Sequence, residues 1–322
     1  ITTLLEIQSM RMIFIALFAM FLTPLNAKEL TVILTSNSDN PTMIARLFTP
    51  YLIKELPGYN RVTFRVVPGA GGLNAANHIY TIAPRDGDTI GLLYKNVPLI
   101  GAVNRQDTNI KFDASQFFWL GSLVDGRKDA SILISNKPYD NDITAGSDNN
   151  VIANPINFIQ KYTNMKLKKI TGYKEPNDVR LAMIRNEVNV IATSLFSTIV
   201  YDKEWITKYH VLVQFGNGRN RHPMLADVPT LNEMITDREA IEALTVVENQ
   251  FALIRSYIAP PGIPVDRSTA LRLAFERASM NTSFIEESRR LGVEISPILH
   301  EEAQAIVRKT YSTPERILNI IK

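Results

Sequence analysis

The chain has no cysteine in its 322 residues. Catalytic thiols, disulfides and thiolate metal sites are therefore excluded. Histidine is scarce as well, and the four histidines show no metal-ligand spacing. No Gly-x-Ser-x-Gly motif, the mark of a hydrolase nucleophile elbow, occurs in the chain. These absences argue against several common kinds of catalysis, and we expect no catalytic residue and no metal.

An excess of charge of one sign is also lacking. The formal net charge is +3, and the lysines and arginines are spread along the sequence. This bias is too weak to predict a nucleic-acid partner or an anionic membrane surface. The densest basic stretch, 161–169, alternates with apolar residues and is typical of a solvated helix end that leads into a strand.

Long apolar runs are few, and one of them lies near the start of the chain. Arg11 precedes the run Met12–Leu22, and the small residue Ala27 follows soon after it. A short positive region, an apolar core of about ten residues and a small exit residue are typical of a secretory signal peptide. A membrane anchor would need roughly 20 apolar residues, and a buried helix is the other alternative. We expect 1–27 to be a signal peptide and the mature chain to begin near Lys28 in the periplasm.

From Lys28 onward, short apolar runs rich in β-branched residues alternate with segments of helical periodicity. This alternation predicts an α/β fold with mainly parallel sheets flanked by helices. We expect strands at 30–34, 62–67, 89–94, 118–123, 131–135, 169–171, 188–192, 211–215 and 253–258, and helices over 43–52, 75–80, 151–162, 177–185 and beyond 266. Two such sets, joined by at least two crossings, predict two hinged lobes: 28–126 with 249–322, and 127–248.

The strongest local feature is a glycine-rich loop between a predicted strand and a predicted helix. Glycines let the backbone approach a ligand closely, and a helix start favours an anion. A dinucleotide fingerprint would need a third glycine at Asn74, and a P-loop would need Lys followed by Ser or Thr there. A tight turn without a ligand stays the alternative. The candidate residues are Pro68, Gly69, Ala70, Gly71 and Gly72.

Polar loops follow other predicted strands. In open α/β sheets, ligands bind beyond the carboxyl ends of the strands, where such loops converge. The loop after the first strand is also suited to capping the next helix through Asp39 or Asn40. The candidates in these loops are Ser36, Asn37, Ser38, Asp39, Asn40, Asn96, Gly146, Ser147 and Asp148.

Two long segments, Arg65–Asn77 and Ile82–Gly91, resemble the Bug family, the solute receptors of tripartite tricarboxylate transporters. Shorter matches follow in the same order along the chain. They are Ala145–Asp148, Ile170–Tyr173, Leu181–Met183, Arg221–Pro223, Asp227–Thr230, Ala259–Pro264 and Leu291–Ile295. Together they cover effectively the whole of the mature chain.

The resemblance implies a two-lobed type II periplasmic binding fold that closes around its ligand. It also implies that the first loop and the glycine loop hold one ligand carboxylate, often through waters. The opposite lobe would contribute Ala145, Gly146, Ser147, Asp148, Ser194 and Ser197. Family ligands are mostly di- and tricarboxylates, amino acids and aromatic acids. The implied protein is a monomer without a cofactor, and its partners are the transporter's membrane subunits.

One departure from the family pattern falls in the first loop. Members usually carry Gly-Gly and then Asp before a pattern that ends in Ala-Arg. This chain keeps Ala45-Arg46, but Ser38 and Asp39 lie in the glycine region and Thr42 stands where the family has Asp. Losing the glycines removes backbone freedom, and Asp39 would repel a second carboxylate. This departure bears on which ligand is bound and not on the family. On the resemblance as a whole, carboxylate capture without chemistry is our leading hypothesis; a signalling receptor and an enzyme of similar fold are the alternatives.

Overall fold

The computed structural model describes residues 28–322 apart from 38–39, 149–154, 174–175 and 203. The predicted signal peptide, 1–27, and the candidates Ser38 and Asp39 lie outside the described residues. The side chains of Asn40, Asp148 and Ser197 lie outside them too. Within the described ranges, no helix is both long and apolar enough to cross a membrane.

The first sheet has the strand order β11-β4-β10-β3-β1-β2. Its strands are β1 (Lys28–Leu34), β2 (Tyr59–Val66), β3 (Thr89–Leu93), β4 (Phe118–Val124), β10 (Ile254–Ala259) and β11 (Ile298–Leu299). β1 pairs in parallel with β2 and β3, and β10 pairs antiparallel with both β3 and β4. β1, β2, β3 and β4 therefore run in one direction, and their carboxyl ends lie at one edge.

The second sheet has the order β7-β6-β8-β5-β9. Its strands are β5 (Ser131–Ser135), β6 (Ile143–Asp148), β7 (Leu167–Tyr173), β8 (Val190–Ser194) and β9 (His210–Phe215). β6 pairs in parallel with β7 and β8, whereas β5 pairs antiparallel with β8 and β9. In each sheet a reversed strand, β5 or β10, is the first strand after the chain crosses from the other sheet.

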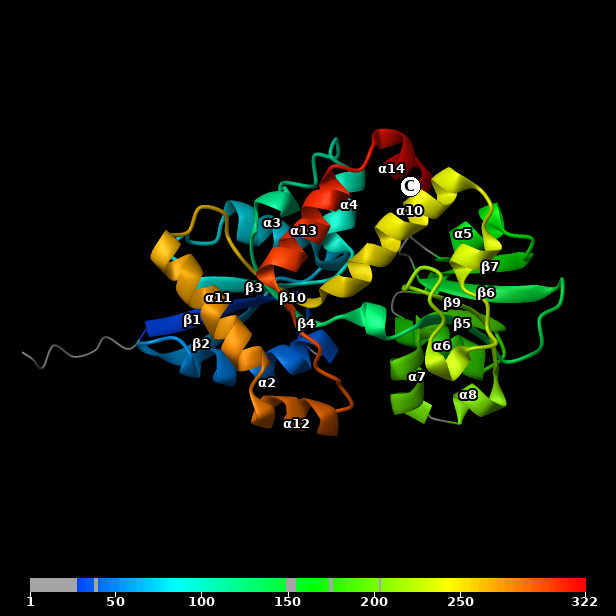
Figure 1. The fold of residues 1–322 in the computed structure, drawn as a ribbon, viewed down its shortest axis with the longest axis horizontal. Coiled ribbons are helices and arrows are strands. Elements are labelled where there is room, and N and C mark those ends of the chain that lie inside the picture. The colour runs from blue at the N-terminus through cyan, green and yellow to red at the C-terminus, as the bar shows by residue number, and fades with distance from the viewer. Residues whose placement is uncertain (1–27, 38–39, 149–154, 174–175, 203) are drawn as a thin grey trace, which may run out of the picture.

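Helices flank both sheets, so the predicted α/β fold with two sheets is confirmed (Figure 1). Around the first sheet lie α2 (Asn40–Lys54), α3 (Leu73–Thr81), α4 (Val97–Val103), α11 (Val265–Ser279), α12 (Thr282–Arg290) and α13 (His300–Tyr311). Around the second lie α5 (Pro155–Tyr162), α6 (Pro176–Ile184), α7 (Leu195–Asp202), α8 (Trp205–Lys208), α9 (Leu231–Met234) and α10 (Arg238–Asn249). The chain ends with α14 (Glu315–Ile321).

Strand alternation explains why the first sheet has a core on each face. Leu30, Val32 and Leu34 of β1 pack in the cluster that contains Phe48 of α2, whereas Ile33 packs in the opposite cluster, with α3 and α13. Residues two apart on a strand share a face, so this split follows from the pleat. Phe48 is fully buried, and burial of such a side chain contributes about 1.5–3 kcal/mol.

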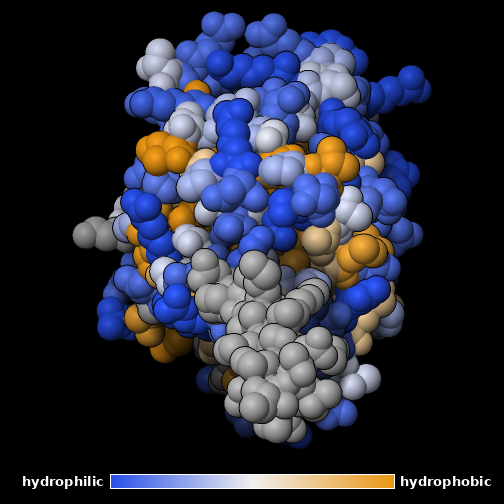
Figure 2. Space-filling view, turned by 90° about the vertical axis from the view of Figure 1, so that its left-hand side faces the viewer, coloured by the Kyte–Doolittle hydropathy of each residue, from blue (hydrophilic) through white to orange (hydrophobic). Residues whose placement is uncertain are grey.

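The surface at the β1 and β2 end of the molecule is mostly hydrophilic. Figure 2 shows this end, with hydrophobic residues in small separate groups. Apolar residues scattered in this way are normal on protein surfaces.

Two segments connect the sheets and touch each other. One contains the short turn η3 (Gly126–Lys128) between β4 and β5; the other contains α10 and the turn η5 (Gln250–Leu253) before β10. A Cβ atom at Gly126 would lie 2.2 Å from Cδ1 of Ile254 and 2.7 Å from the backbone oxygen of Phe251. Only glycine fits at this position, so the two crossings pack as one unit.

The last helix ties the chain end to the second sheet's side of the molecule. Ile317 and Leu318 of α14 share a core cluster with Leu244 and Val247 of α10, and the two helices lie side by side in Figure 1. The lobe boundaries given above stay a prediction, and they assign α14 by sequence to the first lobe.

Candidate functional site

Three loops of the first lobe meet at the carboxyl edge of its sheet. The Val67 N–H donates to the Leu34 carbonyl at 2.9 Å, which brings the loops after β1 and β2 together. A Cβ atom at Gly72 would lie 3.0 Å from Cδ2 of Tyr94 and 3.4 Å from Cγ2 of Thr35. The first loop, the glycine loop and the loop after β3 therefore converge, as the sequence predicted for ligand-binding loops.

The glycine loop has an unusual backbone. Gly69, Ala70, Gly71 and Gly72 all have positive φ, at 109°, 49°, 60° and 92°. α3 begins directly afterwards, and no side chain caps its first turn. The Gly72 N–H donates to the Gly69 carbonyl at 3.1 Å and the Leu73 N–H to the Ala70 carbonyl, so Gly69–Gly71 is the part of the loop whose N–H groups would face an anion, beside the partial positive charge of the helix start. Pro68, Gly69, Ala70 and Gly71 are exposed, so this part of the loop is accessible.

The first loop contributes a buried polar atom that sequence reasoning missed. Thr35 is 4 % exposed, and its Oγ1 has no hydrogen-bond partner in the described structure. A buried hydroxyl without a partner is costly to the fold, and the hydroxyls of Tyr257 and Ser288 in the core of the first sheet share this property. Thr42 is buried as well, and its hydroxyl donates to the Ser36 carbonyl at 2.9 Å, which holds the loop against α2. Asn37 is exposed beside them.

The loop after β3 contributes two polar side chains, Lys95 and Asn96. Asn96 immediately precedes α4, and its side chain makes no capping hydrogen bond. Lys95 is partly buried, and its Nζ lies 3.6 Å from the ring centroid of Phe251. Burial lowers the pKa of Lys95 to about 8, and the negative charge of Asp129 opposes that shift. The sequence predicted Asn96 but not Lys95.

On the side of the second sheet, most of the predicted residues are buried or hydrogen-bonded to other parts of the protein. Ser194 Oγ donates to Asp129 Oδ2 at 2.5 Å, and the Phe196 N–H donates to Oδ1 at 3.0 Å. Ala145 and Gly146 are buried, and a Cβ atom at Gly146 would lie 2.6 Å from Val179. Ser147 is buried as well. Ligand contact by these residues stays a prediction.

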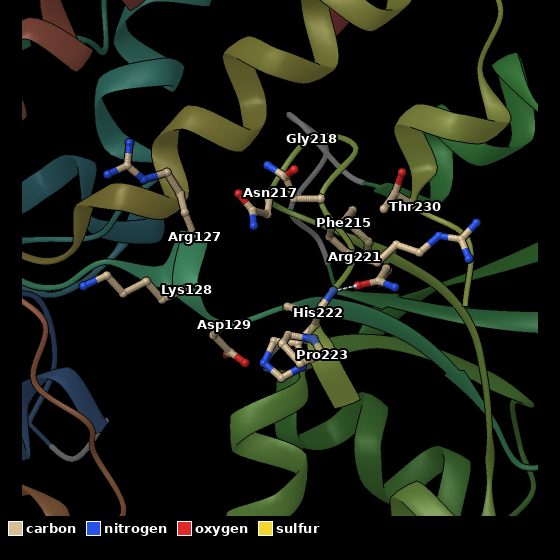
Figure 3. A pocket seen from close by; sticks show the side chains of 13 residues that line it. Arg127, Lys128, Asp129, Phe215, Asn217, Gly218, Arg221, His222, Pro223 and Thr230 are labelled. Atoms are coloured by element: carbon tan, nitrogen blue, oxygen red, sulfur yellow. Dashed lines mark hydrogen bonds between the residues drawn. The ribbon is translucent and has the colours of Figure 1, made fainter. Parts of the chain in front are cut away.

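Asp129 is a carboxylate at the crossing that the sequence did not single out. Burial raises its pKa, and the hydrogen bonds from Ser194 and Phe196 and the charge of His222 lower it in part. The carboxylate lies beside His222 in Figure 3. It therefore links the crossing to the second sheet.

A cavity of about 240 Å³ opens between the crossing and the end of β9 (Figure 3). None of the residues predicted from the sequence is among the described residues that line it. The Arg221–Pro223 segment supported the family resemblance, but its position was not recognised as a site. The lining residues are Arg127, Lys128, Asp129, Ala130, Gln214, Phe215, Asn217, Gly218, Asn220, Arg221, His222, Pro223 and Thr230.

The wall of this cavity is held by a buried carboxylate. Glu248 is 4 % exposed and accepts hydrogen bonds from the N–H groups of Gly216 at 2.8 Å and Gly218 at 3.2 Å. It also accepts one from Nδ2 of Asn232 at 2.9 Å. Burial raises the pKa of Glu248, and these three donors oppose the shift. The network fixes the loop that follows β9.

The arginines that line the cavity already have carboxylate partners. Arg127 forms ion pairs with Asp125 at 2.8 Å and with Glu302 at 2.6 Å. Arg221 forms one with Glu233 at 3.0 Å. Their charges are therefore balanced within the protein. Among the described residues, no group of three His, Asp or Glu side chains lies close enough to hold a metal ion.

Solved structures with a similar fold were found, but no relative was found by sequence. No family model matches the chain, and no curated protein matches it. A TctC solute binding protein from Polaromonas, solved without ligand, superposes with a TM-score of 0.62 at 16% identity, covering 93% of this chain and 99% of that chain. MatC from Rhodopseudomonas palustris with bound malate gives 0.62 at 15% identity, covering 91% and 99%.

Two further solved structures agree. A second R. palustris protein, solved with adipate, gives a TM-score of 0.62 at 14% identity, covering 91% of this chain and 97% of that chain. The periplasmic binding protein BugD gives 0.61 at 16% identity, covering 91% and 96%. The chain therefore has the fold of these solute-binding proteins, as the sequence motifs predicted.

Proposed function

We propose that this chain, which has the fold of the TctC and Bug solute-binding proteins, is an extracytoplasmic member of that family. It captures a small organic carboxylate between its two lobes, without chemical change, and delivers it to a tripartite tricarboxylate-type transporter. The observation that carries this proposal is the convergence of three loops at the carboxyl edge of the first sheet, where the exposed backbone from Gly69 to Gly71 would present N–H groups to an anion.

The chemistry of this edge suits a carboxylate. Backbone N–H groups donate to the oxygens of an anion, and charge-assisted hydrogen bonds contribute about 1.5–3 kcal/mol each. Two such contacts account for a useful part of micromolar affinity, which needs about 8 kcal/mol.

The solved structures support the class of ligand. MatC was solved with malate and the second R. palustris protein with adipate, and both ligands are small dicarboxylates. BugD is described as periplasmic, which is consistent with the signal peptide that the sequence predicts. We infer that the two crossings, which pack against each other at Gly126, are the place about which the two lobes would close on a ligand.

A thermal-shift screen of residues 28–322 against small organic acids tests the proposal. A ligand present at 100 times its Kd stabilises a protein by roughly 2.7 kcal/mol, which raises the melting temperature measurably. We expect at least one di- or tricarboxylate to stabilise the chain, and neutral sugars to have no effect. A screen in which no acid raises the melting temperature contradicts the proposal.

A further inference from the structure

We propose that Lys95 is a ligand-binding residue whose ammonium group receives a carboxylate, so that the site discriminates in favour of ligands with two carboxylates. The glycine loop holds one end of such a ligand and Lys95 holds the other. This inference rests on the proposed function. It adds a charged side chain to a site whose other anion-binding groups are neutral.

The first argument is position. Lys95 follows β3 by two residues, and its neighbour Tyr94 lies against Gly72 of the glycine loop. On the other side, Nζ lies over the ring of Phe251, which packs against Phe215 with 6.2 Å between the ring centroids. Phe215 lines the cavity. Lys95 thus lies between the glycine loop and the cavity wall.

The second argument is the missing counter-ion. Within the described part of the chain, the Lys95 ammonium makes no hydrogen bond and no ion pair; its close contact is the face of the Phe251 ring. Arg127 and Arg221, in contrast, are paired with carboxylates. A partly buried ammonium without a partner is costly to the fold, and a ligand carboxylate would supply that partner.

The charged groups around Lys95 leave this role open. Asp129, on the crossing, is the carboxylate whose charge acts on Lys95. Both oxygens of Asp129 already accept hydrogen bonds, from Ser194 and from the Phe196 N–H, and His222 also acts on it. The Phe251 ring restrains the ammonium by a cation–π contact, so less freedom is lost when a ligand binds.

Three variants test the proposal by titration calorimetry. Lys95→Met keeps most of the apolar stem and removes the charged end, Lys95→Arg keeps the charge, and Lys309→Met removes an exposed lysine on α13 as the matched control. The probes are adipate with hexanoate and succinate with butyrate, each pair differing in one carboxylate. Unliganded melting temperatures of all variants are measured on the same preparations.

We expect the wild-type chain to bind a dicarboxylate at least tenfold more tightly than its monocarboxylate partner. Lys95→Met should weaken dicarboxylate binding by about 10- to 100-fold, as expected for the loss of one charge-assisted contact, and should leave the monocarboxylate within threefold. Lys95→Arg should retain most of the preference, and Lys309→Met should match wild type. Above pH 8 the wild-type preference should decline as the ammonium loses its proton.

The other outcomes separate the two proposals. Binding of no acid by the wild-type chain contradicts the proposed function and this inference with it. Dicarboxylate binding that survives Lys95→Met overturns the inference alone. An equal loss for both members of a pair means that Lys95 acts through closure against Asp129 and not on the second carboxylate, which also overturns it.

Discussion

The edges of the two sheets present different chemical groups. In the first lobe, the groups at the edge are backbone N–H groups, the Thr35 hydroxyl and the Lys95 ammonium, and the last two have no hydrogen-bond partner among the residues described. In the second lobe, the two carboxylates at the edge, Asp129 and Glu248, already accept hydrogen bonds from the protein. In the function that we propose, the first lobe receives the ligand and the second presents a wall held by these two carboxylates.

The largest expected effect comes from breaking the fixed wall. Glu248→Leu leaves the N–H groups of Gly216 and Gly218 and the Asn232 amide without their acceptor in a buried place. Because an unsatisfied buried donor costs about 1–3 kcal/mol, we expect a loss of 3 kcal/mol or more. Urea unfolding measures it, with Glu286→Leu as the control, because Glu286 is an exposed residue of α12. A loss below about 1 kcal/mol would mean that the network does not hold the wall.

A smaller change in the free energy of unfolding, a gain and not a loss, is expected when Lys95 in the first lobe is replaced. The pKa of Lys95 is about 8 in the folded chain and 10.5 in the unfolded chain, so the unfolded chain binds more protons between these values and stability rises with pH there. Below pH 8 the charged lysine costs the fold at most about 3 kcal/mol. Unliganded Lys95→Met should thus be more stable than wild type at pH 7.

Measuring the stability of both proteins over a range of pH tests whether the charge of Lys95 is the cause. The stability difference between Lys95→Met and wild type should shrink as pH rises from 8 to 10.5, since wild type then loses its buried charge on its own. A variant less stable than wild type at pH 7 would show that Lys95 supports the fold, and the contrast between the two edges would be lost.

The sequence predicted the architecture well because alternation is a local property. The strand at 131–135 agrees with β5 at both ends, and the helix expected over 43–52 lies inside α2. α4 was missed because Val97–Val103 is apolar throughout and shows no helical period. α10 does have a periodic buried face, at Ala240, Ala243, Leu244 and Val247, and could have been found.

The site was only half predictable. The glycine loop could be predicted from its residue types alone. The role that we propose for Lys95, in contrast, depends on its contact with Phe251, which is far from it in the sequence. The loop at 217–223 is held as a cavity wall by contacts that include Glu248, which lies beyond α9, and the ion pair between Arg221 and Glu233. Contacts between residues far apart in sequence carry no local pattern, so a single sequence cannot reveal them.

The glycine loop offers the most direct measurement of the central claim that its backbone holds a carboxylate. Gly71 and Gly58 both have positive φ, at 60° and 85°, and a Cβ atom at either would meet no atom within 4 Å. A side chain at either position should therefore cost similar stability, about 1–2 kcal/mol, through backbone strain. Gly58 lies beside Lys28, at the opposite end of β1 from the loop.

The measurement is the calorimetric affinity of the best dicarboxylate for Gly71→Val and Gly58→Val, with both melting temperatures recorded. The account predicts that both variants melt slightly below wild type and that Gly71→Val alone binds at least tenfold more weakly, because its side chain blocks the approach to the backbone N–H groups. Equal affinities in the two variants would show that the glycines serve only the turn, and would contradict the account.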